Sequence, residues 1–272
     1  MSTRRPLKAL GQNFLVDNNV IEKIVRSADI SPEDNVLEIG PGRGALTVHL
    51  ERLAGRLVLI EFDHALARQL KYRYEDNPRV TVIDADVLAV DLADLLEREG
   101  GAARWKVVAN LPYNISTAVL FHLQEVRDKL SRMILMLQKE VGDRLVARPD
   151  CSDYGITTVL LGLWFDIRRE FIVPPGCFQP CPKVDSAVLS FVSLPGPRVP
   201  VGDEAVFRKV VKGSFAMRRK TLINCLKAAE LAPVDDLRGM LAECGIDGQR
   251  RGETLSMDEF AALSRLLSGM AQ

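Results

Sequence analysis

The sequence lacks any apolar run long enough to cross a membrane, and residues 1–6 lack the apolar segment of a secretory signal. We therefore expect a cytoplasmic protein with no membrane partner. Cysteine is scarce: the five residues are odd in number and form no C-x-x-C pair, which favours reduced thiols over disulfides or a zinc site. We expect no metal site. None of the three histidines stands in a triad-like context that would indicate a catalytic role.

The chain also lacks a net charge, because 36 Lys and Arg residues balance 36 Asp and Glu residues. Net charge therefore gives no sign of a nucleic-acid partner, and any such interpretation depends on local clusters. A run of like charges is usually a solvated face of the protein. The basic residues that could instead contact nucleic-acid phosphates are Arg4, Arg5, Lys8, Arg218, Arg219, Lys220, Arg250 and Arg251.

Short apolar runs alternate with segments of helical periodicity over most of the chain. This order predicts an α/β fold with a doubly wound parallel sheet, whose ligands bind at the carboxyl ends of the strands. We predict strands at 36–39, 56–62, 80–83, 105–109 and 132–137, and helices at 18–28, 45–53, 64–74, 116–125 and 138–147. Strands at 166–173 and 186–192 are predicted to close the sheet as an antiparallel pair.

A stretch rich in proline and glycine, residues 195–202, interrupts every periodic pattern and predicts a linker between two domains. The first domain, residues 1–194, begins with a basic segment at 1–12 and contains the sheet. The second domain, residues 203–272, is predicted to be all-helical, with helices at 203–213, 215–231, 234–244 and 256–268. At 272 residues the chain is long enough for a main domain and a small second one.

A glycine-rich turn at residues 40–44, Gly-Pro-Gly-Arg-Gly, joins the strand 36–39 to the helix 45–53. Glycine allows unusual backbone dihedrals and close approach of a ligand, and the first N–H groups of the following helix favour an anionic group such as a carboxylate. Gly40 and Gly42 are therefore candidate ligand-binding residues. The G-x-G-x-G spacing differs from the dinucleotide pattern G-x-G-x-x-G, which argues against a pyrophosphate.

Acidic residues follow the next two predicted strands. Glu61 lies at the end of the strand 56–62, about 20 residues after the glycine turn, where nucleotide-binding α/β folds place an acid that holds ribose hydroxyls. Asp86 follows the strand 80–83 and could accept a hydrogen bond from an adenine amino group. Asp86 and its neighbour Asp84 can each also be interpreted as surface acids.

The turn Asn110-Leu111-Pro112-Tyr113 follows the apolar strand 105–109, so it lies at a carboxyl end of the predicted sheet. Pro112 lacks an N–H group and favours an extended conformation of Leu111. The turn therefore presents carbonyl oxygens with one backbone N–H fewer to compete for them. Asn110 adds a neutral side-chain carbonyl, and Tyr113 offers a flat face for a planar ring. These groups suit an aromatic amine, although the same pattern also occurs as a plain strand-to-helix turn.

A proline-rich loop at residues 174–183 presents Phe178 between the last two predicted strands. Loops of this kind carry function more often than their share of the chain. Phe178 is either a core residue or, facing Tyr113, the second half of an aromatic clamp.

The chain resembles the bacterial small-subunit ribosomal RNA adenine dimethyltransferases, relatives of the erythromycin-resistance methyltransferases. The resemblance is carried by five motifs in order: Gly11-Gln12-Asn13-Phe14-Leu15, Glu38-Ile39-Gly40-Pro41-Gly42, Asn110-Leu111-Pro112-Tyr113-Asn114-Ile115-Ser116, Phe178-Gln179-Pro180-Cys181-Pro182-Lys183-Val184-Asp185-Ser186-Ala187 and Phe215-Ala216-Met217-Arg218-Arg219-Lys220-Thr221-Leu222. The last two look more like the housekeeping enzymes than the resistance enzymes. Ala85, Cys181 and Met217 depart from the usual pattern, but none removes a group that the chemistry requires.

The resemblance implies a Rossmann-like S-adenosylmethionine-dependent methyltransferase sheet with a small all-helical C-terminal domain that recognises RNA. It implies two methyl transfers to N6 of each of two adjacent adenosines in a 3'-terminal hairpin loop of small-subunit rRNA. The expected partner is the small ribosomal subunit precursor, and we expect a monomer. The implied cofactor-binding residues are Asn13, Leu15, Gly40, Gly42, Glu61, Asp86 and Asn110, and the expected catalytic residues are Asn110, Leu111, Tyr113 and Phe178.

Rival functions stay open at this point. A methyltransferase acting on DNA, a small molecule or another RNA would share the sheet and cofactor, but a DNA or small-molecule enzyme would leave the basic helical tail unexplained. A non-catalytic assembly checkpoint factor would need the RNA contacts and not the methyl transfer. A dinucleotide-dependent oxidoreductase is disfavoured by the glycine spacing.

Overall fold

The computed structural model describes residues 13–270, and contacts within the chain divide it into two compact units. One unit comprises the chain up to Gly142 together with Asp166–Ser193, and the other comprises Asp143–Phe165 together with the chain from Leu194. The proline and glycine pattern predicted a boundary at residues 195–202, so Asp143–Phe165 was expected in the first domain. The helix α7 (Ile156–Gly162) explains this difference, because it buries Val159, Leu160 and Leu161 and contacts the second unit's helix α8 (Glu204–Ser214).

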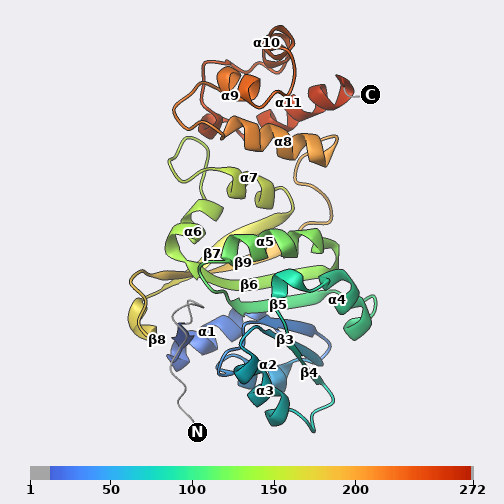
Figure 1. Ribbon diagram of the computed structural model, residues 1–272, viewed down its shortest axis with the longest axis vertical. Coiled ribbons are helices and arrows are strands. Elements are labelled where there is room, and N and C mark those ends of the chain that lie inside the picture. Colours follow the sequence, from blue (N-terminus) through green and yellow to red (C-terminus); the bar gives the residue numbers. More distant parts are fainter. Residues whose placement is uncertain (1–12, 271–272) are drawn as a thin grey trace. The chain divides into compact units, whose positions relative to one another are not determined.

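The described part of the first unit contains a seven-stranded sheet in the order β4-β3-β2-β5-β6-β9-β7 (Figure 1). The first five of these are parallel, β9 is antiparallel to β6, and β7 lies beyond β9 at the edge, so the two closing strands lie where the sequence placed them. The strands are β2 (Asn35–Ile39), β3 (Arg56–Glu61), β4 (Val80–Asp84), β5 (Trp105–Asn110), β6 (Leu130–Gln138), β7 (Phe165–Val173) and β9 (Ser186–Ser193).

The central strands consist mainly of β-branched residues and leucine because both faces of the sheet are covered. Val36, Val58 and Val107 are each fully buried, as are their neighbours Leu37 and Leu59. The helices of this unit are α1 (Asn18–Ala28), α2 (Thr47–Leu53), α3 (His64–Arg73), α4 (Leu92–Gly100), α5 (Ser116–Glu125) and α6 (Lys139–Leu145), the last of which extends beyond Gly142. Two short strands, β1 (Phe14–Leu15) and β8 (Phe178–Gln179), pair with each other and not with the large sheet.

The second unit is helical in its described part, with α7 and α8 followed by α9 (Leu222–Ala228), α10 (Val234–Glu243) and α11 (Met257–Met270) (Figure 1). The predicted helix at 215–231 is wrong over its first turns. Helix α8 ends at Ser214, and Thr221 is extended at the N-cap of α9, so the residues between them form turns. The helices α4 and α7 and the β1–β8 pair were not predicted from the sequence.

No helix among residues 13–270 is both long enough and apolar enough to span a lipid bilayer.

Gly252 lies against the end of α8, and this contact generates a prediction about stability. A Cβ atom added at Gly252 would lie 2.4 Å from the Ser214 carbonyl oxygen, which is backbone and cannot move aside cheaply. We expect Gly252→Ala to lower the free energy of unfolding by roughly 1–3 kcal/mol in urea denaturation. Gly239→Ala is the control, because Gly239 is exposed within α10 with no atom near its Cβ position, so it should be neutral or stabilising by about 1 kcal/mol. Equal stability of the two variants would contradict the packing argument.

Candidate cofactor and adenine site

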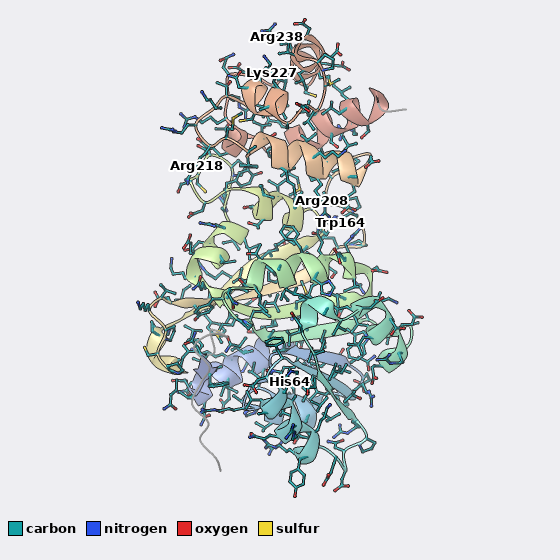
Figure 2. The ribbon with its side chains drawn as sticks, in the orientation of Figure 1. His64, Trp164, Arg208, Arg218, Lys227 and Arg238 are labelled. Atoms are coloured by element: carbon teal, nitrogen blue, oxygen red, sulfur yellow. The ribbon has the colours of Figure 1, made fainter. Side chains whose placement is uncertain are left out.

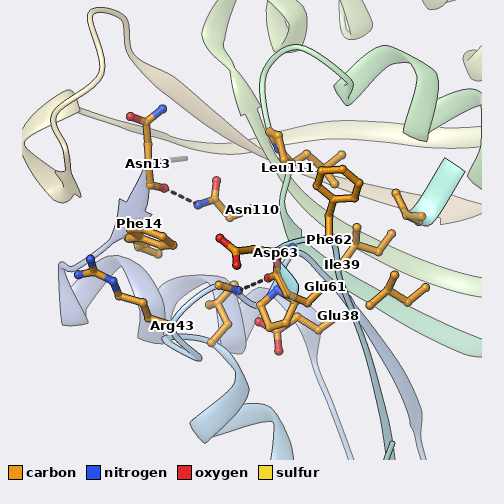
Figure 3. A pocket seen from close by; sticks show the side chains of 18 of the residues that line it. Asn13, Phe14, Glu38, Ile39, Arg43, Glu61, Phe62, Asp63, Asn110 and Leu111 are labelled. Carbon is orange, nitrogen blue, oxygen red and sulfur yellow. Dashed lines mark hydrogen bonds between the residues drawn. The ribbon is translucent and has the colours of Figure 1, made fainter. Parts of the chain in front are cut away.

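A cavity of about 480 Å³ lies at the carboxyl ends of β2, β3, β4 and β5 (Figure 3). Its position agrees with the rule that open α/β sheets bind ligands beyond the carboxyl ends of their strands. Nine of the predicted site residues line it: Asn13, Leu15, Gly40, Gly42, Glu61, Asp86, Asn110, Leu111 and Tyr113. The glycine turn, the two acids and the Asn110 turn are therefore brought together in one place.

The glycine turn requires glycine at two of its positions. Gly40 and Gly42 have φ angles of +66° and +59°, a region that other residues rarely adopt. A Cβ atom at Gly42 would also come within 3.0 Å of the Phe14 ring. Without side chains at these two positions, the backbone of the turn borders the cavity directly and lies close to the Phe14 ring.

Glu61 holds the glycine turn in place through its carboxylate. One oxygen, Oε2, accepts the Gly42 N–H at 2.8 Å, and the other, Oε1, accepts the Asp63 N–H at 2.8 Å. Burial raises the pKa of Glu61, while these two backbone donors stabilise its charged form. Each carboxylate oxygen has a second lone pair, so Glu61 keeps the capacity to accept hydrogen bonds from ribose hydroxyls, and that role stays a prediction.

The two candidate aspartates differ. Asp86 lines the cavity, and its Oδ1 accepts the Leu88 N–H at 3.0 Å. Asp84 does not line it and pairs at 2.5 Å with the exposed His64, which Figure 2 labels. Asp84 is therefore a surface acid, and Asp86 is the acid that can face a ligand.

Asn110 has a defined side-chain orientation. Its amide Nδ2 donates a hydrogen bond to the Asn13 backbone carbonyl oxygen at 3.1 Å, as the dashed line in Figure 3 shows. Only the NH₂ end can donate to a carbonyl, so Oδ1 is the end that remains as an acceptor. This is the neutral oxygen acceptor that the sequence predicted for the turn.

The rest of this turn is tied to the neighbouring strands. The Leu111 N–H donates to the Met136 carbonyl oxygen at 3.1 Å, and its side chain is buried. The Tyr113 hydroxyl forms a hydrogen bond of 2.8 Å with the Ser186 hydroxyl on β9, and burial raises the pKa of the tyrosine. Tyr113 is half-buried and lines the cavity, and its hydroxyl is held by Ser186.

Phe178 is a correction to the predicted clamp. It is 4% exposed, belongs to the hydrophobic core with Leu15 and Val173, and does not line the cavity. The cause is the pairing of β8 with β1, in which Phe178 lies opposite Leu15. The core interpretation is confirmed, and Phe178 offers no face to a base beside Tyr113.

Several side chains that line the cavity had no role predicted from the sequence, among them Phe14, Arg43, Phe62 and Glu38. Arg43 stacks over the Phe14 ring at 4.4 Å, Phe62 is 51% exposed, and Glu38 is almost fully buried (Figure 3). A signal was present for two of them: Glu38 is a charged residue inside an apolar strand, and Phe62 is an aromatic placed just after the acid that ends β3.

The predicted basic clusters differ in whether the structure describes them and in their exposure. Arg4, Arg5 and Lys8 lie outside the described residues. Arg218, Arg219 and Lys220 are exposed in the turn between α8 and α9, where Arg218 donates to the Ser152 carbonyl oxygen at 3.4 Å. Other basic side chains of this unit, shown in Figure 2, are Arg208, Lys227 and Arg238.

Arg250 is a second correction, because its guanidinium has structural partners. It is paired with both oxygens of Glu259 and also donates to the side chain and carbonyl oxygen of Thr254. These contacts use most of its donors to hold the segment before α11. Arg251 is exposed, with Glu253 at 4.0 Å, and stays a candidate for RNA contact.

The cavity fits a cationic cofactor that carries a nucleoside. Its volume of about 480 Å³ is typical of a small-molecule site. Four carboxyl side chains and one guanidinium line it, so its charge balance favours a cation. Glu38 also has an oxygen, Oε2, that is buried without a hydrogen-bond partner, which indicates a polar group missing from its surroundings.

A parallel sheet of this order, with a glycine turn after β2 and acids after β3 and β4 that line the cavity, agrees with the class that the family match shows, a Rossmann-like S-adenosylmethionine-dependent methyltransferase. The family model described as ribosomal RNA adenine dimethylase matches residues 5–268, and the chain belongs to this family. The expected cofactor, S-adenosylmethionine, and the expected class of enzyme are thereby confirmed.

Curated relatives match over nearly the whole chain. The chain is 58% identical to the ribosomal RNA small subunit methyltransferase A of Geobacter metallireducens, covering 98% of this chain and 97% of that protein. It is 55% identical to the protein of the same name from Geobacter sulfurreducens, covering 96% and 95%. Among solved structures, a dimethyladenosine transferase from Plasmodium falciparum aligns with a TM-score of 0.80 at 24% identity over 95% of this chain and 98% of that one, which supports the fold.

The geometry of Gly42 predicts the effect of a small substitution on cofactor binding. Gly42→Ala places a Cβ atom 3.0 Å from Phe14 at a positive φ, which costs about 1–3 kcal/mol of strain. We expect binding of S-adenosylmethionine, measured by calorimetry, to weaken at least about tenfold. Gly196→Ala, where nothing lies near the Cβ position, should bind like the unchanged protein. Unaltered affinity in Gly42→Ala would show that the turn does not face the cofactor.

Proposed function

We propose that this protein transfers methyl groups from S-adenosylmethionine to N6 of two adjacent adenosines in a 3'-terminal hairpin loop of small-subunit rRNA, twice on each. The observation that carries the proposal is the Asn110 amide, which is oriented by Asn13 and lies in the same cavity as the glycine turn. The relatives named above support the choice of small-subunit rRNA. The substrate would be a precursor of the small subunit, methylated by a monomer in the cytoplasm.

The chemical task is to make an adenine amino group nucleophilic, because its lone pair is conjugated with the ring. Asn110 Oδ1 and the Leu111 carbonyl oxygen would accept hydrogen bonds from the two N–H groups of the adenine amino group. These bonds would tilt the amino nitrogen toward a tetrahedral geometry. The lone pair would then point at the methyl group. The cofactor supplies that methyl group on a sulfonium, which is already activated.

Most of the acceleration would come from positioning, which can contribute up to about 7–11 kcal/mol. No general base is needed before the attack. Tyr113 would hold the extruded base by stacking, with its ring fixed by the hydroxyl contact to Ser186. Since Phe178 is buried, Tyr113 is the aromatic residue that we assign to this contact.

RNA loops expose unstacked bases, which favours a loop adenosine over one in a duplex. The exposed Arg218, Arg219 and Lys220, together with Arg251, would contact phosphates.

The test is mass spectrometry of RNA after incubation with S-adenosylmethionine and unmethylated small ribosomal subunits, with free nucleoside and DNA as comparison substrates. We expect dimethyladenosine in the small-subunit RNA alone. Tyr113→Ala should lose about 1–3 kcal/mol of base binding, while Tyr113→Phe, which keeps the ring, should retain most of the activity. Methylation of DNA or free nucleoside in place of subunit RNA would overturn the proposal, and an absence of methylation with every substrate would favour an assembly factor.

Phosphate contacts by the turn between α8 and α9 predict a change in the salt dependence of RNA binding. Replacing Arg218, Arg219 and Lys220 by Ala should lower the slope of log affinity against log salt by about 2, at about 0.7 per contact. A control variant replaces three exposed bases of the first unit, Lys71, Arg98 and Arg168, and should leave the slope nearly unchanged. Equal slopes for the two triple variants would remove this turn from the RNA-binding surface.

A further inference from the structure

Glu38 is a carboxylic acid buried inside the sheet with no visible structural task. It lies in β2 between Leu37 and Ile39, is 1% exposed, and lines the cofactor cavity. Its Oε2 accepts no hydrogen bond from any residue that the structure describes. Burying a polar atom without a partner is costly, so a protein that retains one there gains something when a ligand is bound.

The other three carboxyl groups of the cavity are already committed to backbone donors. Glu61 accepts two N–H groups, as described above. Asp63 accepts the N–H groups of the first turn of α3, and Asp86 accepts the Leu88 N–H. Glu38 differs from them because it holds the only buried carboxyl oxygen without a partner among residues 13–270.

The surroundings keep Glu38 neutral when no cation is present. Burial raises the pKa of Glu38 to about 8; the charge of Glu61 acts in the same direction, and the Thr47 hydroxyl from α2 opposes it. Tyr74, at the end of α3, is also within electrostatic range of Glu38. The other charged groups that line the cavity are Asp63, Asp86 and Arg43.

We propose that Glu38 makes the cavity selective for the charged cofactor over its uncharged product. When the sulfonium of S-adenosylmethionine enters, the O–H bond of Glu38 breaks, the proton passes to solvent, and the carboxylate stays as counter-charge. Transfer of the methyl group turns the sulfonium into a neutral thioether, and Glu38 takes a proton back from solvent. The product S-adenosylhomocysteine then lacks the charge that held its precursor, which favours its release.

The inference depends on the cofactor and not on the RNA target, so it is tested by binding alone. Calorimetry of the full chain without RNA, in buffers of different ionisation enthalpy, measures the protons released with each ligand. A group with a pKa of about 8 is about 90% protonated at pH 7, so S-adenosylmethionine should release up to about 0.9 proton and S-adenosylhomocysteine almost none. Between pH 6 and pH 7, below the pKa of about 7.7 of the ligands' α-amino group, cofactor affinity should rise up to about tenfold and product affinity much less.

Glu38→Gln keeps the shape of the side chain and removes its ionisable proton. We expect this variant to release no proton with either ligand and to lose about tenfold of its preference for cofactor over product. The control is Asp84→Asn, an acid at the end of a strand of the same sheet that pairs with His64 outside the cavity, and it should behave like the unchanged protein.

Several results would overturn the inference. Equal proton release with both ligands would assign the effect to the ammonium group that they share. Proton release that persists in Glu38→Gln would assign the release to Glu61. An absence of proton release by the unchanged protein would show that Glu38 does not change its charge. The last measurement needs no variant and holds even if Glu38→Gln fails to fold. Failure of the unchanged protein to bind either ligand would instead contradict the assigned cofactor.

Discussion

The hydrogen bond from the Asn110 side chain to the Asn13 carbonyl oxygen is the contact on which the chemistry of the cavity depends. An amide can present either its oxygen or its NH₂ group, and only the oxygen can accept hydrogen bonds from the N–H groups of an aromatic amine. Asn13 makes this choice because a backbone carbonyl oxygen can only accept. The orientation is therefore set before any substrate arrives, and no energy is spent on it during the reaction.

The acidic side chains of the cavity have different hydrogen-bond partners. Glu61, Asp63 and Asp86 each accept backbone N–H groups at the start of a turn or helix, so their charges shape the loops and are already stabilised. Glu38 has no such donor at Oε2 and is surrounded by apolar strand residues. The carboxyl groups of one cavity thus differ in their hydrogen-bond partners, as expected for groups with different tasks.

Local patterns in the sequence were enough to predict most of the first unit. The strand β3, the helix α3 and the glycine turn are each set by residues close together in the chain, so their periodicity and spacing predicted the fold and residues that line the cavity. Phe178 and Arg250 were misinterpreted because distant partners decide their environments. Phe178 is buried by its pairing with Leu15, and Arg250 is neutralised by Glu259. The helix α7 was missed for a related reason, since it is stabilised by contacts with α8, far along the chain.

The pairing of β1 with β8 has a consequence for synthesis of the chain. Phe14 and Leu15 are synthesised more than 160 residues before their partners Gln179 and Phe178. Pairing between such distant segments must wait for the later one. The strand β1 therefore stays without its partner while β2 to β7 are synthesised, and the β1–β8 pair can form only after residue 179 has left the ribosome.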